Sequence, residues 1–125
     1  MIHLENLCRH FKVGNQIVRA LDEVDLDINK NEYVSIMGVS GSGKSTLLNI
    51  LGLLDTPTSG SYVLSGVSTS KMNDDEMAHI RSTKIGFIFQ SFHLIPRLTA
   101  AENVEMPMVL SGLNPKERKE KTDMA

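Results

Sequence analysis

The polar and apolar positions at the start of the chain follow the pattern of a β hairpin. Residues 2–12 mix β-branched, aromatic and polar side chains, and the Gly14-Asn15 pair that follows suits a tight turn with positive φ. Over residues 17–28, apolar side chains alternate with acidic ones at nearly every second position. Because a period of two places the apolar side chains on one face, we expect a second strand whose other face meets water.

Two compact apolar runs further along the chain predict buried strands. Residues 33–37 form the first run, which stops at Gly38, and residues 85–89 form the second, which stops at Gln90. Short, mostly apolar runs are typical of parallel strands, which are covered on both faces. A further short strand is expected at residues 62–64.

Helices are predicted between and after these strands. Residues 45–54 contain helix-forming side chains without a proline, and the turn residues 56–60 follow them. Three further helix starts combine an N-cap side chain with a glutamate three residues later. The pairs are Asn73 with Glu76, Thr99 with Glu102, and Asn114 (before Pro115) with Glu117. Strands that alternate with helices in this way predict an α/β fold.

Composition and charge narrow the function classes. The 125 residues carry 13 basic and 15 acidic side chains, a formal net charge of −2, and 41% of them are apolar. These values are ordinary for one globular domain, and without a cluster of Lys or Arg there is no electrostatic reason to expect nucleic-acid binding. The longest apolar-rich stretch, residues 46–54, is far shorter than the roughly 20 residues that span a bilayer.

The single cysteine and the histidines are interpreted as structural residues. Cys8 cannot form a disulfide within the chain, and we expect it to be a small buried hydrophobe without thiol chemistry. The histidines show no metal-ligand spacing, so we expect surface or packing roles for them. They are His3, His10, His79 and His93.

Residues 38–46 carry the strongest motif in the sequence. They read GVSGSGKST, which fills the pattern GxxxxGK[ST], and they lie between a predicted strand and a predicted helix. Glycines let successive backbone N–H groups converge on phosphate oxygens, and a helix N-terminus adds roughly half a positive charge. Lys44 is expected to reach the β- and γ-phosphates, Ser45 to ligate Mg²⁺ and Thr46 to lie near the α-phosphate. The predicted nucleotide-binding residues of the loop are Gly38, Ser40, Gly41, Ser42, Gly43, Lys44, Ser45 and Thr46.

Phosphate loops occur in kinases, GTPases, motors and transporters, so this motif alone leaves the class of protein open. The chain also contains the segments MIHLENLCRHF, GVSGSGKSTLLNILGLLDTPTSG and IRSTKIGFIFQSFHLIPRLTAAENVEMPM. In these segments it resembles the ATP-binding subunits of ABC transporters, and the resemblance covers essentially the whole chain. Within that superfamily it is similar to the macrolide-export and lipoprotein-release group.

The resemblance implies the fold of an ABC-type P-loop NTPase, with ATP and Mg²⁺ as cofactors. Residues 1–90 would form a portion of the nucleotide-binding core, with the hairpin, a parallel-sheet core and the phosphate-loop helix. Residues 91–125 would start a helical subdomain. Gln90 matches the Q-loop glutamine, which touches Mg²⁺ and the attacking water, so Gln90 and Lys44 are the implied catalytic residues. Phe11 falls where the family places the aromatic side chain that stacks on adenine. From the residues alone, a polar strand end for Gln90 and a core phenylalanine for Phe11 stay open.

The resemblance also implies partners and a location. A full-length subunit would form a homodimer of ATP-binding domains and would bind a membrane permease, so it would lie in the cytoplasm at the inner face of the membrane. Residues 91–96 would face the permease, with an ordinary exposed loop as the alternative. The implied function is to power the export of a macrolide-like compound, a peptide or a lipoprotein.

Three parts of such an ATPase are missing from the sequence. C-terminal to Gln90 there is no LSGGQ-type signature, no Walker B strand that ends in Asp beside a catalytic Glu, and no switch histidine. We therefore expect an incomplete domain that exposes apolar strand edges and does not hydrolyse ATP alone. The competing interpretation is a short, non-catalytic nucleotide-binding or permease-binding module. A nucleotide kinase would leave the segment around Gln90 unexplained.

Overall fold

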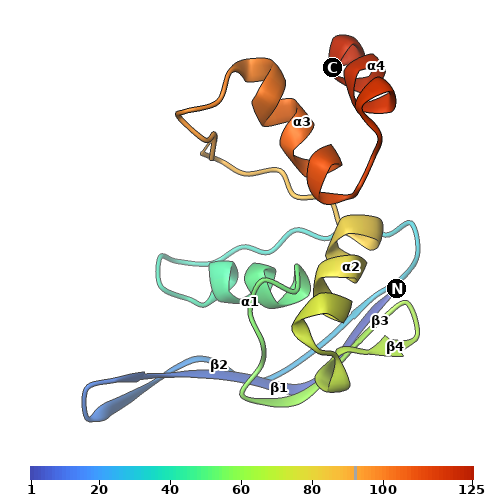
Figure 1. The fold of residues 1–125 in the computed structure, drawn as a ribbon. Coiled ribbons are helices and arrows are strands. Elements are labelled where there is room, and N and C mark those ends of the chain that lie inside the picture. The colour runs from blue at the N-terminus through green and yellow to red at the C-terminus, as the bar shows by residue number, and fades with distance from the viewer. Residues whose placement is uncertain (92) are drawn as a thin grey trace. The chain divides into compact units, whose positions relative to one another are not determined.

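The computed structural model describes residues 1–91 and 93–125. These residues form two compact units, Met1–Gly86 and Phe87–Ala125. The first unit contains the β-sheet and two α-helices, and the second contains two further α-helices (Figure 1).

The sheet of the first unit has four strands in the order β2-β1-β3-β4, and every neighbouring pair is antiparallel. Strands β1 (Ile2–Val13) and β2 (Gln16–Ile28) form the predicted hairpin. Strand β3 (Ser59–Leu64) pairs with the other edge of β1, and β4 (Val67–Ser68) pairs with β3. The hairpin and the strand expected at residues 62–64 are thus confirmed.

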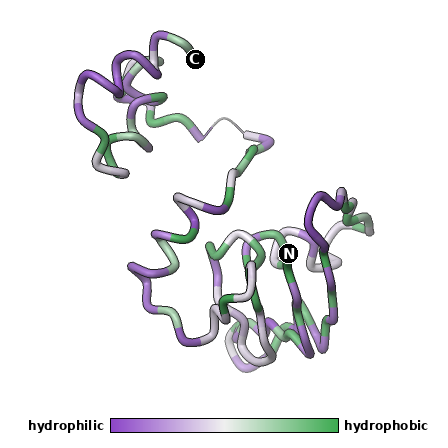
Figure 2. The backbone as a smooth tube through the Cα atoms, turned by 90° about the vertical axis from the view of Figure 1, so that its right-hand side faces the viewer, coloured by the Kyte–Doolittle hydropathy of each residue, from purple (hydrophilic) through white to green (hydrophobic). Residues whose placement is uncertain are grey.

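The core of the first unit lies between the sheet and its helices. Helices α1 (Lys44–Leu51) and α2 (Asp74–Lys84) lie on the same side of the sheet (Figure 1). Apolar and polar residues alternate along the hairpin strands, so that one face can be buried (Figure 2). Each fully buried large side chain stabilises the fold by roughly 1.5–3 kcal/mol. The core cluster consists of Leu4, Leu7, Leu21, Leu47, Ile50, Leu53, Tyr62 and Leu64.

Tyr62 connects the sheet to the end of α1 by a buried polar contact. Its side chain is 1% exposed, and its hydroxyl donates a hydrogen bond of 2.7 Å to the backbone carbonyl of Leu51. Burial raises the pKa of Tyr62 to about 12. Because the folded state keeps this proton after the unfolded state has lost it, stability falls as the pH rises above the ordinary tyrosine pKa of about 10.

We expect Tyr62→Phe to lower the free energy of unfolding at neutral pH by about 1–3 kcal/mol, because the carbonyl of Leu51 loses its donor. Above about pH 10 the variant should lose stability less steeply than the wild type, by up to about 1.4 kcal/mol per pH unit. Urea unfolding at about pH 9 and pH 11 measures both effects. Parallel stability curves for the two proteins would contradict the assigned pKa.

The capping box predicted at Asn73 starts α2. The Asn73 side chain accepts a hydrogen bond from the Glu76 backbone N–H at 2.9 Å, and the Glu76 carboxylate accepts one from the Asn73 N–H at 2.9 Å. Helix α1 ends at Leu51, earlier than the predicted residue 54. The chain leaves the helix there because Leu53 has a left-handed backbone conformation with φ 55°.

The second unit consists of α3 (Ala100–Leu110) and α4 (Pro115–Met124), which contact each other. Thr99 and Glu102 form the predicted capping box of α3, and the Asn114 side chain caps α4. These N-caps satisfy backbone donors at the helix starts and typically stabilise by about 1 kcal/mol each. In the described part of the chain, no helix is both long and apolar enough to cross a membrane.

The prediction of parallel strands at residues 33–37 and 85–89 is wrong for this structure. Neither run is a β-strand, and Tyr33 and Ile88 are 95% and 101% exposed. A buried parallel strand needs a neighbour that supplies hydrogen bonds to its backbone. Among residues 1–91 and 93–125, every paired strand belongs to the antiparallel sheet, so neither run has such a neighbour. Several apolar side chains of the two runs are exposed to solvent, among them Tyr33, Met37, Ile88 and Phe89.

Candidate phosphate-binding site

Glycine residues shape the loop that leads into α1. Gly41 and Gly43 have φ values of +80° and +86°, which side chains with a Cβ rarely adopt. Gly43 is the N-cap of α1 and lies against β2: a Cβ there would be 2.3 Å from the backbone oxygen of Ala20. The hairpin therefore fixes the position at which the loop turns into the helix.

The side chain of Lys44 lies across this loop. Its Nζ donates hydrogen bonds to the backbone oxygens of Gly38 and Val39, at 2.9 and 2.6 Å, and it is 3.4 Å from the Oγ of Ser42. The ammonium group is thus held near both ends of the loop at the start of α1. A cation in this place adds to the positive end of the helix dipole.

The N-terminus of α1 is free to receive an anion. The first backbone N–H groups of a helix have no partner within the helix. In the part of the chain that the structure describes, no side chain caps α1, and its first turn contains no acidic residue. Ser45 is exposed and Thr46 is half-buried in that turn, so hydroxyl groups accompany the backbone donors. Such an arrangement is suited to phosphate oxygens.

Phe11 lies on β1 of the same unit and is outside the buried core. Its side chain is 36% exposed, and the guanidinium carbon of Arg9 lies 4.5 Å from its ring centre. Arg9 also makes a two-point ion pair with Asp55, at 2.8 and 2.7 Å. Since Asp55 follows α1 in the chain, Arg9 connects the ring of Phe11 to the end of the phosphate-loop helix.

Gln90 belongs to the second unit, Phe87–Ala125, and it is exposed. The rings of Phe87 and Phe89, just before it, stack with 5.4 Å between their centres. The roles of Gln90 at Mg²⁺ and at the attacking water stay predictions. The sequence predicts that residues 91–96 face a permease, and Phe92 of this segment lies outside the described residues.

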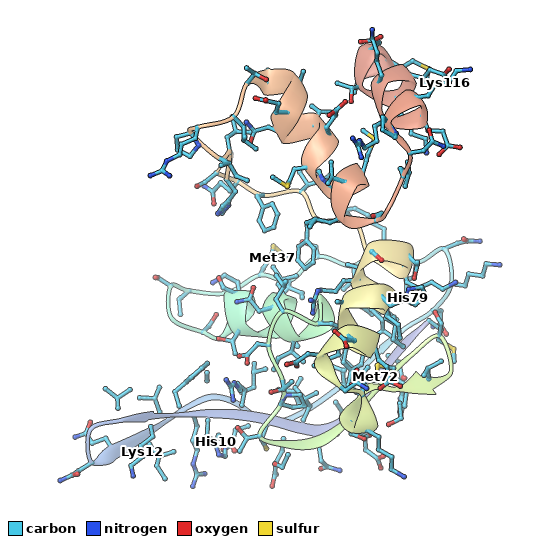
Figure 3. All side chains as sticks on the ribbon, in the orientation of Figure 1. His10, Lys12, Met37, Met72, His79 and Lys116 are labelled. Atoms are coloured by element: carbon cyan, nitrogen blue, oxygen red, sulfur yellow. The ribbon has the colours of Figure 1, made fainter. Side chains whose placement is uncertain are left out.

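The sequence does not predict one cluster of side chains that could hold a metal ion. Cys8, His10 and Asp22 bring their ligand atoms within 4.8 Å of one another on the hairpin. Figure 3 shows His10 and Lys12 along this hairpin. Cys8 and His10 are two positions apart on one strand, and this spacing is the only indication of the cluster in the sequence. It does not indicate Asp22, which lies on the next strand.

These features define the class of the protein: a P-loop protein of mixed α/β fold, with an uncapped helix start, a lysine over the loop and hydroxyl groups beside it. The family model described as ABC transporter matches residues 21–125. The chain therefore belongs to the ABC transporter family. This confirms the resemblance inferred from the sequence.

Individual relatives agree with this assignment. The chain is 51% identical over 125 residues to an uncharacterized ABC transporter ATP-binding protein, YknY of Bacillus subtilis, and covers 100% of itself and 54% of YknY. It is 50% identical over 121 residues to the macrolide export ATP-binding/permease protein MacB of Brucella abortus, covering 97% of itself and 19% of MacB.

A solved structure is similar to the chain in fold as well as in sequence. It is the ATP-binding cassette MJ0796 of Methanocaldococcus jannaschii, a dimer in a post-hydrolysis state bound to ADP and Pi. The TM-score is 0.89 at 47% identity, and the match covers 98% of this chain and 54% of MJ0796. The chain thus spans about half the length of YknY and of the MJ0796 cassette.

Proposed function

We propose that the protein binds MgATP at the phosphate loop as part of an ABC transporter ATPase that powers a membrane permease. The observation that carries this proposal is the Lys44 ammonium held over a glycine loop at the uncapped start of α1, in a chain of the ABC transporter family. A charged lysine and free N–H groups at one helix start favour the triphosphate.

The residues of the phosphate loop contribute to MgATP binding in different ways. Gly41 and Gly43 give the backbone the bend at which N–H groups converge on phosphate oxygens. Lys44 exchanges its hydrogen bonds to neutral carbonyl groups of the loop for stronger ones to the negatively charged β- and γ-phosphates. Ser45 and Gln90 would hold Mg²⁺, which neutralises phosphate charge when bound. Ser45 is exposed in the first turn of α1, so its hydroxyl fits that part.

Phe11 would stack on the adenine ring. The guanidinium group of Arg9 already lies over the Phe11 ring, 4.5 Å from the ring centre, and its ion pair with Asp55 holds it there. Stacking of a base on an aromatic side chain contributes about 1–3 kcal/mol. Arg9 therefore fixes the orientation of Phe11 while the rest of the ring stays accessible, which agrees with its exposed fraction of 36%.

Hydrolysis would need more than residues 1–125. The sequence contains no signature motif, catalytic glutamate or switch histidine, and the chain spans about half of YknY. We propose that the complete protein forms a homodimer, as MJ0796 does in its solved structure, and that it works with a permease at the inner face of the membrane.

Export of a macrolide-like compound, a peptide or a lipoprotein is the proposed task, supported by the likeness to MacB. A short, non-catalytic binding module is the alternative.

We expect Phe11→Ala to weaken MgATP binding by about 5- to 150-fold, because the adenine loses its stacking partner. Binding of a fluorescent ATP analogue, displaced by unlabelled ATP, measures the effect. Val13→Ala is the matched control, since Val13 is an exposed apolar residue at the end of the same strand. Equal affinities for Phe11→Ala and the wild type would remove Phe11 from the site.

The alternative is tested by ATP turnover. The proposal expects no hydrolysis by residues 1–125 on their own, and hydrolysis by the complete protein that disappears in Lys44→Ala. Turnover by residues 1–125 that Lys44→Ala abolishes would show that the missing motifs are not needed.

A further inference from the structure

Three side chains of different chemistry, none of them assigned to nucleotide binding, converge on the hairpin. Cys8 and His10 belong to β1, and Asp22 belongs to β2. The Oδ1 of Asp22 lies 3.2 Å from the Nε2 of His10 and 3.9 Å from the Sγ of Cys8. All three ligand atoms lie within 4.8 Å of one another.

An irregularity in the hairpin explains why these residues meet. Leu7 pairs with Val24 and Arg9 pairs with Leu21, so the single residue Cys8 faces two residues of β2, one of them Asp22. Such a bulge re-aims side chains and increases the local twist. The register shifts again between Arg9 and His10. A regular hairpin would leave these side chains in ordinary cross-strand positions.

Neighbouring groups hold each ligand atom in place. The Sγ of Cys8 accepts a hydrogen bond of 3.2 Å from the backbone N–H of Glu23, which fixes the position of the sulfur between the strands. Arg19 donates to the Oδ2 of Asp22 at 3.2 Å, which leaves the Oδ1 turned toward His10 and Cys8. Outer contacts of this kind orient the ligands of metal sites.

The set of one sulfur, one imidazole nitrogen and one carboxylate oxygen is suited to zinc. Zinc binds these three groups in tetrahedral geometry, with bonds of about 2.0–2.3 Å, so two of its ligand atoms lie about 3.3–3.7 Å apart. The two separations from the Asp22 oxygen, 3.2 and 3.9 Å, differ from this range by a few tenths of an ångström, and the Cys8 sulfur lies within 4.8 Å of the His10 nitrogen. Mg²⁺ and Ca²⁺ prefer sites built from oxygen atoms alone.

We infer that Cys8, His10 and Asp22 form a binding site for Zn²⁺, with the fourth position open to water. The ion would cross-link β1 to β2 beside Phe11, because His10 precedes that residue in the strand. The site does not depend on nucleotide binding, since none of its ligands belongs to the phosphate loop.

Co²⁺ is a spectroscopic probe for this site, used on the reduced, purified protein without a histidine tag. We expect a near-ultraviolet charge-transfer band from cobalt bound to the Cys8 thiolate, together with the visible bands of four-coordinate cobalt. One equivalent of Zn²⁺ should displace the cobalt and remove the charge-transfer band and the visible bands. In Cys8→Ser the charge-transfer band should be absent.

His10→Gln and Asp22→Asn should each weaken Zn²⁺ binding at least about tenfold, because each removes one of three protein ligands. These two side chains are partly exposed, so both variants are expected to fold, which circular dichroism verifies. His3→Gln is the matched control: His3 and Asp27 form a similar pair at 2.6 Å on the same two strands, without a cysteine. A missing thiolate band in the wild type, or equal Zn²⁺ affinity in His10→Gln and the wild type, would overturn the site.

Discussion

Replacing Lys44 by alanine is expected to weaken MgATP binding by about 10- to 150-fold. The ammonium is held at the start of α1 by the backbone oxygens of Gly38 and Val39, where it can turn to the phosphates. Charge-assisted hydrogen bonds of this kind contribute about 1.5–3 kcal/mol, which corresponds to that change in the dissociation constant.

Titration calorimetry with MgATP measures the effect of Lys44→Ala. Lys30→Ala serves as the control, because it removes an exposed lysine of the same unit that lies outside the loop. Unfolding in urea, measured in parallel, separates weaker binding from a damaged fold. Superimposable titration curves for Lys44→Ala and the wild type would mean that this loop does not bind the triphosphate.

Gly43→Ala is expected to lower the free energy of unfolding by about 2–5 kcal/mol. The backbone of Gly43 has φ +86°, and a Cβ would lie 2.3 Å from the backbone oxygen of Ala20. A left-handed conformation costs an alanine about 1–2 kcal/mol, and the clash forces the start of α1 away from β2 at a further cost of about 1–3 kcal/mol. The loop should lose its phosphate-binding shape as well.

Gly14→Ala separates the two contributions in this prediction. Gly14 also has positive φ, +60°, but a Cβ there would meet nothing within 4 Å. Its substitution should therefore cost only the backbone strain of about 1–2 kcal/mol. If urea denaturation gives equal losses for Gly43→Ala and Gly14→Ala, then the contact between the loop and β2 is not what fixes the loop.

Helix starts and turns that depend on residues a few positions apart could be predicted from the sequence. The N-caps at Asn73, Thr99 and Asn114 depend on residues three positions away, and all three are present. The turn at Gly14 joins two strands whose alternation of polar and apolar residues was recognisable. The spacing between the glycines and Lys44 of the phosphate loop is a local pattern as well, whereas the position of the loop depends on the contact of Gly43 with β2.

Features that depend on distant partners could not be predicted in the same way. The apolar runs at residues 33–37 and 85–89 have the composition of buried strands, but a strand forms only where another strand pairs with it. The contact of Arg9 with Asp55 joins residues 46 positions apart, and nothing in the local pattern indicates it. Asp22 meets Cys8 only because a bulge shifts the register of the hairpin.

The most direct test of MgATP binding at the phosphate loop is the effect of MgATP on backbone amide resonances in the NMR spectrum of the protein. The account predicts that the largest shifts fall on residues 41–46, whose N–H groups would donate to the phosphates, and that Lys44→Ala abolishes them at the same ligand concentration. Unchanged resonances at residues 41–46 under saturating MgATP, or shifts centred on α3 and α4 instead, would contradict it.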